Sequence, residues 1–131
     1  MTVPAKKTAL ITGFTSGIGL ALAQHLAAHN WRVIGLARSA VAARHTIEVL
    51  RARTGNSALF SYVADLSLLR DVEAVTDKIA AEHPEIDLLI NNAGALFTKR
   101  TETSEGAEST FALNHLAPFA LTTRLLPTLA P

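Results

Sequence analysis

Short apolar runs alternate along this chain with longer segments in which apolar residues recur every third or fourth position. The runs cover residues 9–11, 31–37, 59–64 and 86–90. They do not alternate strictly between apolar and polar positions, as a strand with one solvated face does. We therefore expect strands of a parallel sheet that is covered on both faces.

Three of the intervening segments are predicted to be helices that pack on this sheet. In the first helix, an apolar stripe is formed by Ile18, Leu22 and Leu26. A less regular helix is expected over about residues 40–53, and Gly55-Asn56 is a good C-terminal stop for it. In the third, the stripe is formed by Leu68, Val72, Val75 and Ile79.

A last helix is predicted after the fourth strand. Ser104 is a suitable N-cap residue, and Glu105 and Glu108 would then lie near the positive N-terminal end of the helix. The helix would run towards Leu126, and Pro118 inside it would produce a kink.

The chain thus reads as a strand–helix unit repeated along its length. Because crossovers between parallel strands are right-handed, this order predicts an open, doubly wound α/β sheet of the Rossmann type with strand order 3-2-1-4. We expect one domain over residues 1–131, since this length supports one hydrophobic core. The sheet would be truncated after its fourth unit. Its apolar fourth strand would then have a free edge that favours association, including a homo-oligomer.

The composition narrows the classes of protein to which the chain can belong. Hydrophobic residues make up 49% of the 131 positions and charged residues 18%, and the net charge is +1, so neither disorder nor a nucleic-acid-binding surface is indicated. The absence of cysteine excludes disulfides and thiolate metal sites. Residues 1–7 are too few and too polar for a signal peptide, and no run approaches the roughly 20 apolar residues of a membrane span. We expect a soluble, cytoplasmic protein.

The most informative segment follows the first strand and reads Thr12-Gly13-Phe14-Thr15-Ser16-Gly17-Ile18-Gly19. Glycines at this spacing let the turn tighten and let the backbone approach a pyrophosphate, while the next helix directs its free N–H groups and positive dipole end at the phosphates. The position between a strand and a helix favours nucleotide binding over an ordinary glycine-rich turn, which is the alternative. No Gly-Lys-Ser/Thr sequence occurs, which disfavours a nucleoside-triphosphate P-loop.

The histidines do not indicate a metal site. His25 and His29 are four residues apart on one predicted helix, a spacing that two ligands of one metal can share. No Glu lies between them in a metalloprotease pattern, and no third ligand is evident. We interpret both as part of a solvated helix face.

The glycine spacing Gly-x-x-x-Gly-x-Gly resembles that of the short-chain dehydrogenase/reductase family, and three further motifs match this family in the same order. Asp65-Leu66 ends the third strand, Asn91-Asn92-Ala93-Gly94 ends the fourth, and Asn114 lies in the helix that follows. The sequence from Thr110 to Phe119 is most similar to retinol-dehydrogenase-like members. The resemblance covers essentially the whole chain and implies the N-terminal portion of such an enzyme.

The resemblance implies roles for individual residues. Asp65 and Leu66 would contact the adenine ring, and Asn114 would hold a water of the family's proton relay. Phosphate and nicotinamide-ribose contacts would come from Gly13, Thr15, Ser16, Gly17, Ile18, Gly19, Asn92, Ala93 and Gly94. From the residues alone, Asp65 can instead be a helix N-cap, and Asn91 can satisfy backbone groups at the strand end.

The end of the second strand bears on the choice between the two nicotinamide dinucleotides. An NAD site places an acidic residue there for the ribose hydroxyls, whereas an arginine can hold the 2′-phosphate of NADP through charge-assisted bonds. The strand end reads Ala37-Arg38-Ser39 and has no acid. We therefore predict NADP(H), with NAD as the second choice, and the alternative for Arg38 is a solvated surface side chain.

The catalytic tyrosine, lysine and serine that the resemblance implies would follow a fifth strand and are not found in this sequence. The one tyrosine, Tyr62, lies inside the third predicted strand. We thus expect a chain that is inactive by itself, with three interpretations open. It is part of an oxidoreductase that acts on a small hydrophobic alcohol or carbonyl compound, or a non-catalytic NADP-binding module or pseudoenzyme, or an interaction or assembly protein completed by a partner chain.

Overall fold

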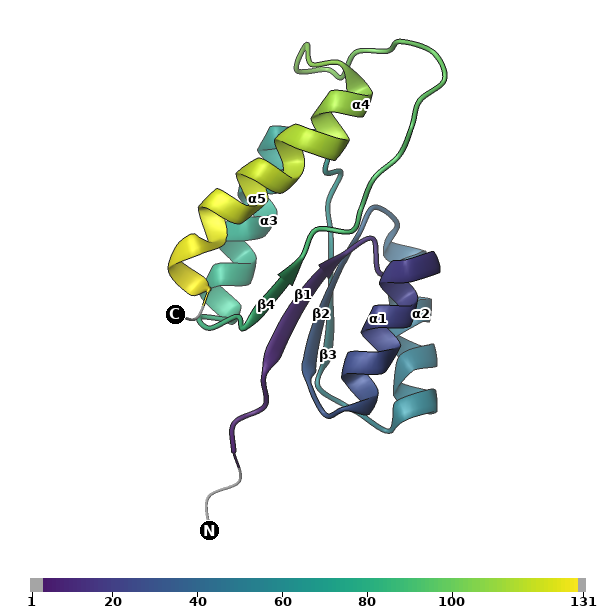
Figure 1. The fold of residues 1–131 in the computed structure, drawn as a ribbon, viewed down its shortest axis with the longest axis vertical. Helices are drawn as coiled ribbons and strands as arrows, with labels where there is room; N and C mark the ends of the chain where they lie inside the picture. Colours follow the sequence, from purple (N-terminus) through teal and green to yellow (C-terminus); the bar gives the residue numbers. More distant parts are fainter. Residues whose placement is uncertain (1–3, 130–131) are drawn as a thin grey trace.

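The sheet of this protein has four parallel strands in the order β3-β2-β1-β4, as the sequence predicts. A computed structural model describes residues 4–129 (Figure 1). The strands are β1 (Thr8–Thr12), β2 (Arg32–Ala37), β3 (Leu59–Val63) and β4 (Leu88–Ile90). The order reverses between β1 and β4, so the carboxyl ends of these two strands form a switch point, where ligands bind in sheets of this kind.

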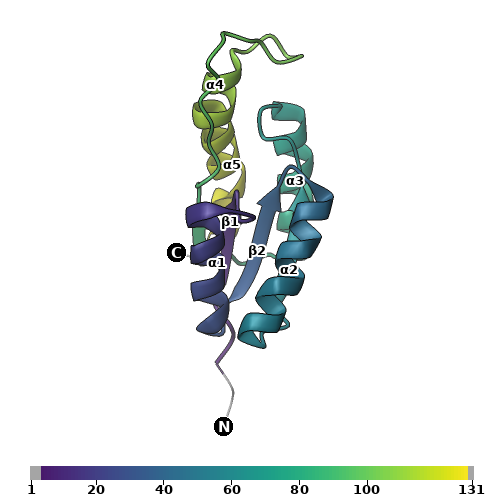
Figure 2. The same ribbon diagram turned by 90° about the vertical axis from the view of Figure 1, so that its right-hand side faces the viewer.

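Helices cover both faces of the sheet (Figures 1 and 2). One face carries α1 (Gly17–Ala28) and α2 (Ala40–Thr54), and the other carries α3 (Leu69–Glu82) and α5 (Ala117–Leu125). Between β4 and α5 the chain forms the short helix α4 (Ser109–Phe111) and the π-helical turn Ala112–Leu116, and a 3₁₀ turn, Leu126–Thr128, follows α5. Among residues 4–129, no helix combines the length and the apolar character needed to cross a bilayer.

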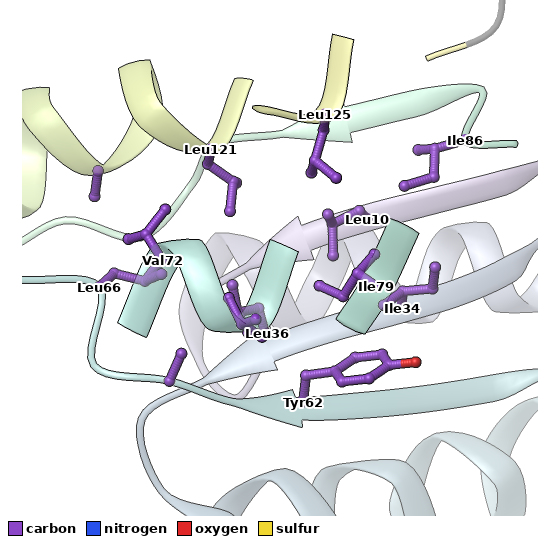
Figure 3. Close-up of a cluster of buried hydrophobic side chains, with 13 residues drawn as sticks. Leu10, Ile34, Leu36, Tyr62, Leu66, Val72, Ile79, Ile86, Leu121 and Leu125 are labelled. Carbon is purple, nitrogen blue, oxygen red and sulfur yellow. The ribbon is translucent and has the colours of Figure 1, made fainter. Parts of the chain in front are cut away.

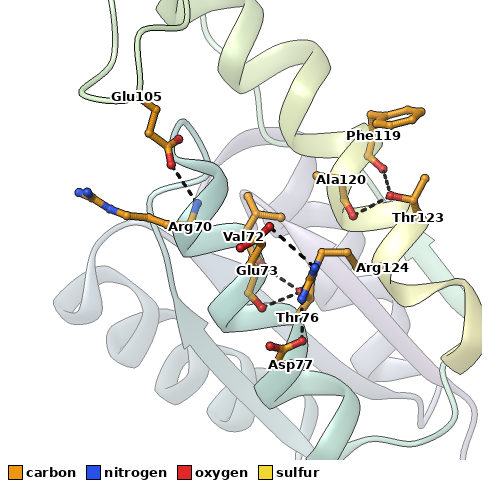
Figure 4. Close-up of polar contacts among 10 residues, drawn as sticks. All are labelled: Arg70, Val72, Glu73, Thr76, Asp77, Glu105, Phe119, Ala120, Thr123 and Arg124. Atoms are coloured by element: carbon orange, nitrogen blue, oxygen red, sulfur yellow. Dashed lines mark hydrogen bonds and ion pairs between the residues drawn. The ribbon is translucent and has the colours of Figure 1, made fainter.

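The core on the α3–α5 face consists mainly of large aliphatic side chains, together with Tyr62 (Figure 3). Val72 and Ile79 of α3, with Leu121 and Leu125 of α5, are essentially inaccessible to solvent. The stripe predicted for α3 is therefore confirmed, although its first member, Leu68, is the N-cap residue and only half-buried. Arg124 joins the two helices at the surface, where it donates to Thr76 Oγ1 at 2.9 Å and to Asp77 Oδ1 at 2.8 Å (Figure 4).

On the α1–α2 face, the stripe predicted for α1 is confirmed in part, because Leu22 and Leu26 are half-buried against this core and Ile18 is not. Gly19, Ala23 and Ala27 face the sheet, while Ile18 is 73% exposed. Small residues are needed because α1 begins directly after the turn that leaves β1, so its backbone approaches that turn closely. Hydrophobicity alone placed the stripe one position away from the face that sterics select.

The start of the last helix also differs from the prediction. The helix begins at Ser109, not after Ser104, and its N-cap is Glu108. The amides of Phe111 and Thr110 donate to the Glu108 carboxylate, and these bonds lower its pKa. Residues 101–109 instead form a hairpin, with Glu102 bridged to Glu108, so the N-terminal end of the helix is moved along the chain.

Pro118 follows a π-helical turn, which is the local form of the predicted distortion. Pro118 lies in the first turn of α5 and has no amide hydrogen to donate to the carbonyl of Asn114. The preceding turn instead closes through the wider bond from the Ala117 amide to the Ala112 carbonyl. Asn114 therefore lies within an irregular helical turn.

The segment that leads into β4 pairs with the end of the described chain. The Ile86 amide donates to the Thr128 carbonyl at 2.8 Å, and Ile86 forms a parallel bridge with Leu129. The fourth strand is shorter than predicted, since its ladder with β1 begins at Leu88. Leu88, Leu89 and Ile90 are only half-buried, so part of this apolar edge remains accessible.

Candidate functional site

A glycine turn joins β1 to α1 at the switch point of the sheet. Gly13 and Gly17 have φ angles of +67° and +55°, which L-residues with side chains rarely adopt. Gly19 is needed for space, because a Cβ on it would collide with the Gly13 carbonyl group. The three glycines are thus required by the shape of the turn.

The N-terminal end of α1 is not capped by its own N-cap side chain. Ser16 occupies the N-cap position and, within the described residues, makes no side-chain hydrogen bond to the helix. The first amides of a helix have no intrahelical partner, and they carry the positive end of the helix dipole. Ser16, Gly17 and Ile18 are exposed, so this end of α1 is accessible to an anion.

Thr12 connects the glycine turn to the end of β4. Its Oγ1 accepts hydrogen bonds from the amides of Asn92 and Ala93, both at 2.9 Å. In the other direction, Asn92 Nδ2 donates to the carbonyls of Thr12 and Gly13, both at 3.1 Å. These bonds hold the two loops of the switch point in one arrangement. They also use both amide hydrogens of the Asn92 side chain.

Asn114 fixes the chain just beyond β4. Its Nδ2 donates to the Ala95 carbonyl at 2.7 Å, and its Oδ1 accepts from the Ala95 amide at 2.9 Å. A Cβ on Gly94 would lie 3.1 Å from Asn114 Oδ1, so Gly94 permits this close approach. Asn91 instead donates from Nδ2 to Thr122 Oγ1 at 3.0 Å and thereby ties the end of β4 to α5.

Asp65 shapes the loop that follows β3. Its Oδ1 accepts from the amide of Ser67 at 3.0 Å and from the Ser67 hydroxyl at 2.6 Å, and its own amide donates to Asp71 Oδ2 at 3.0 Å. Leu68 is the N-cap residue of α3, so the interpretation of Asp65 as a helix N-cap is wrong. Asp65 closes a side-chain turn of the kind that aspartate commonly forms, and this turn leads into α3.

These loops surround a cleft of about 380 Å³ at the carboxyl ends of the strands. That volume is within the range of small-molecule sites. Nine of the residues singled out by sequence line it: Gly13, Thr15, Ser16, Arg38, Asp65, Leu66, Asn92, Ala93 and Gly94. These nine residues come from segments that lie far apart in the sequence, and the fold brings them together around the cleft.

Four predicted site residues lie outside this lining. Gly17 and Ile18 are exposed at the start of α1, Gly19 is buried beneath the turn, and Asn114 lies behind Ala95. Several lining residues were not predicted: Leu36, Ala37, Ala64, Ser67, Ala95, Phe97 and Leu113. Most of them flank the predicted positions along the chain, whereas Phe97 reaches the cleft through a loop whose path has no sequence signal.

Arg38 lies at the rim of the cleft directly after β2. Its side chain is exposed, and among residues 4–129 it has no ion-pair partner. The next residue, Ser39, caps α2 by accepting a hydrogen bond from the Ala42 amide at 3.2 Å. The cap fixes where the strand ends and the helix begins, and Arg38 lies between the two, in the lining of the cleft.

Known proteins place this arrangement in a family. A family model described as short chain dehydrogenase matches residues 7–130. The chain belongs to the short-chain dehydrogenase family. It is 35% identical to retinol dehydrogenase 12 of Mus musculus over 92% of its own length and 38% of that relative. It is 38% identical to the chloroplastic short-chain dehydrogenase TIC 32 B of Brassica napus, over 91% of its own length and 37% of that relative.

Solved structures agree with the fold. A short-chain dehydrogenase from Sphingobium yanoikuyae in complex with NADPH matches with a TM-score of 0.79 and 33% identity, over 92% of this chain and 47% of that one. The NADP complex of Pseudomonas aeruginosa RhlG matches with a TM-score of 0.80 and 30% identity, over 95% and 48%. This short-chain dehydrogenase chain therefore spans less than half the length of these relatives.

Proposed function

We propose that this chain is the NADP(H)-binding portion of an oxidoreductase that transfers a hydride between the dinucleotide and an alcohol or carbonyl compound. The observation that carries the proposal is the cleft itself. Within residues 4–129, it combines a glycine turn, a helix N-terminus without a side-chain cap and an arginine without an ion-pair partner, at the carboxyl ends of the strands. Each of these features suits a different part of a phosphorylated dinucleotide.

The glycine turn fits the diphosphate. Side chains at Gly13 and Gly19 would fill the space next to Asn92 and the turn backbone, so glycine at both positions keeps the turn tight enough for a diphosphate to reach the backbone. Gly17 and Ile18 begin α1, and their amides would donate to the phosphate oxygens, with Thr15 and Ser16 beside them. The positive end of the helix dipole favours the negative charge.

The far rim of the cleft fits an adenosine that carries a 2′-phosphate. Asp65 and Leu66 line the cleft on the β3 side, where the adenine ring would lie. Arg38 lies at the adjacent strand end and forms no ion pair with an acidic side chain among the described residues. A guanidinium binds a phosphate through charge-assisted hydrogen bonds, which favours NADP over NAD. The similar structures from Sphingobium yanoikuyae and Pseudomonas aeruginosa, with NADPH and NADP bound, support this choice.

The opposite end of the dinucleotide would meet the segment after β4. The ribose next to the nicotinamide would be lined by Asn92, Ala93 and Gly94. The nicotinamide is the ring of the dinucleotide that carries the hydride. The side chain of Asn114 is engaged with Ala95. If Asn114 holds a water for proton transfer, its backbone carbonyl is the suitable group, because Pro118 cannot donate to it.

This portion by itself is expected to bind the dinucleotide without turning it over. The chain has one tyrosine, Tyr62, and its hydroxyl is hydrogen-bonded to Glu82 and His83. Burial and the nearby Glu82 carboxylate raise the pKa of Tyr62, whereas a tyrosine that exchanges a proton near neutral pH needs a lowered one. The relatedness to retinol dehydrogenases supports a hydrophobic alcohol or carbonyl substrate for the longer enzyme.

Calorimetric titration of the 131-residue chain with NADP⁺ and with NAD⁺ tests the proposal. We expect binding of both dinucleotides, with a lower dissociation constant for NADP⁺, and no reduction of a carbonyl compound when NADPH is supplied. A folded sample that binds neither dinucleotide at millimolar concentration would contradict the proposed function.

A further inference from the structure

Two loops supply separate parts of the lining of the cleft. The loop from β3 to α3 contributes residues 64–67, and the loop from β4 to α4 contributes residues 92–95 and Phe97. Neither loop is part of the sheet, so each needs other contacts to keep its position. The relation between them decides whether the cleft keeps one shape.

The loop after β4 folds back on itself as a small hairpin. The Thr103 amide donates to the Ala107 carbonyl at 2.7 Å, and the Gly106 amide donates to the Thr103 carbonyl at 2.9 Å. Gly106 has a φ of +81°, which allows the tight turn at the tip. The hairpin presents the side chain of Glu105 at this tip, towards α3 (Figure 4).

Glu105 caps the N-terminal end of α3 from another part of the chain. The Leu69 amide donates to Glu105 Oε1 at 2.6 Å, and the Arg70 amide donates to Oε2 at 3.1 Å. The N-cap residue of α3 is Leu68, whose side chain has no hydrogen-bonding group, so the first amides of the helix depend on this carboxylate. Its negative charge also opposes the positive end of the helix dipole.

We propose that Glu105 is a positioning residue that ties the two cleft loops together and thereby sets the affinity for the dinucleotide. This inference rests on the proposed function. Glu105 lies beyond the cleft lining and acts through its neighbours. On one side, the Glu105 carboxylate bonds to Leu69, which follows the loop from β3 to α3. On the other side, the hairpin that carries Glu105 continues the loop after β4, in which the Phe97 amide donates to Thr110 Oγ1 at 3.3 Å.

Affinity depends on this connection because a ligand that spans both loops must find them at the right separation. When only a fraction of the molecules has the binding-competent arrangement, the apparent dissociation constant rises by the inverse of that fraction. If untied loops hold the arrangement in about one-tenth of the molecules, the constant rises about tenfold. Preorganisation of this kind raises affinity without any new contact to the ligand.

The test compares Glu105→Ala and Glu105→Gln with the wild-type chain by calorimetric titration with NADP⁺. We expect the alanine variant to raise the dissociation constant about tenfold. The glutamine variant keeps one acceptor oxygen, so its effect is smaller. The matched control is Glu102→Ala, because the Glu102 carboxylate lies in the same hairpin and, among the residues that the structure describes, bonds only to Arg100, at 3.0 Å. Its dissociation constant should match that of the wild type.

A second readout separates positioning from a purely structural role. Hydrogen exchange at the amides of Leu69 and Arg70 should accelerate in Glu105→Ala and not in Glu102→Ala. Faster exchange with an unchanged NADP⁺ dissociation constant would overturn the inference and leave the proposed function intact. A wild-type chain that binds no dinucleotide would overturn the proposed function, and the inference with it.

Discussion

Two groups of polar side chains in this molecule use their hydrogen bonds differently. At the carboxyl ends of β1 and β4, Thr12 and Asn92 bond to backbone groups of the neighbouring loops. At the C-terminal end of α3, the side chains bond mainly to one another, since the Tyr62 hydroxyl contacts both Glu82 and His83, with His83 Nε2 at 2.9 Å.

The first group fixes the positions of loops that line the cleft, and the second group fixes the packing of a strand against a helix. Thr12 and Asn92 tie the glycine turn to the loop after β4, and these loops line the cleft through Gly13, Asn92 and Ala93. Side chains that satisfy one another close a structural contact between β3 and α3. A polar residue near a strand or helix end is therefore informative about function only when its hydrogen-bond partners within the protein are also known.

The largest effect is expected when the turn at the first group is filled. In Gly19→Ala, the added methyl group would collide with the Gly13 carbonyl group and crowd Asn92. We expect a loss of stability of about 3 kcal/mol, with loss of NADP⁺ binding. Urea denaturation and calorimetric titration measure the two effects. Ala21→Ser, at an exposed position of the same helix, is the control, and equal behaviour of both variants would refute the close approach.

A smaller effect is expected when the bonds of Thr12 are removed without a change of shape. Thr12→Val removes the acceptor of the Ala93 amide and leaves the Asn92 amide only its bond to the Ile90 carbonyl, which we expect to cost about 2 kcal/mol of unfolding free energy. Thr12→Ser keeps the hydroxyl and should restore most of the stability and the NADP⁺ affinity. If the valine variant is as stable as the serine variant, Thr12 does not hold the two loops.

In the second group, Tyr62→Phe should reduce stability and leave nucleotide binding unchanged. The variant leaves the buried His83 ring without its hydroxyl partner, at an expected cost of about 1 kcal/mol. Ser61→Ala, an exposed position on the same strand, serves as the control for urea denaturation. A large change in the NADP⁺ dissociation constant of Tyr62→Phe would show that the two groups are not independent.

The smallest effect concerns pH. Burial of His83, reinforced by the positive charge of Arg32 and opposed by Glu82, lowers its pKa from the usual value of 6.5. The unfolded chain therefore takes up a proton more readily than the folded protein. The contribution of His83 to stability should be complete above pH 6.5 and should decline as the pH falls through and below that value.

Urea denaturation at a series of pH values between 5 and 8 measures this decline. His83→Gln removes the titrating group, so its stability should depend less on pH over this range. A wild-type chain whose stability rises towards pH 5 relative to His83→Gln would contradict the direction of the shift.

Much of the fold follows from local sequence signals, and much of the cleft does too. The runs around Ile11 and Ile34 predicted the strands, and right-handed crossovers then set the strand order. The glycines between Thr12 and Leu20 indicated a phosphate-binding turn, because their requirement is local and steric. Asn92 was predicted from family resemblance, and its bonds to Thr12 add a reason that the sequence alone does not reveal.

The features that were missed depend on contacts between distant residues. The stripe through Ile18 was placed by hydrophobicity, while the close approach of α1 to the turn selects the face with Ala23. Glu105 was assigned to the start of the last helix, but it caps α3, 36 residues earlier in the chain. A capping side chain supplied by a distant hairpin leaves no pattern in the local sequence.

The most direct test of the account is the preference for NADP⁺ over NAD⁺ in the wild type and in Arg38→Ala, measured by calorimetry. Arg51→Ala, which removes an exposed arginine from the last turn of α2, is the control. A charge-assisted bond of about 1.5–3 kcal/mol predicts that Arg38→Ala weakens NADP⁺ binding by about tenfold to a hundredfold, with NAD⁺ binding unchanged. Equal affinity for the two dinucleotides in the wild type and in Arg38→Ala would contradict it.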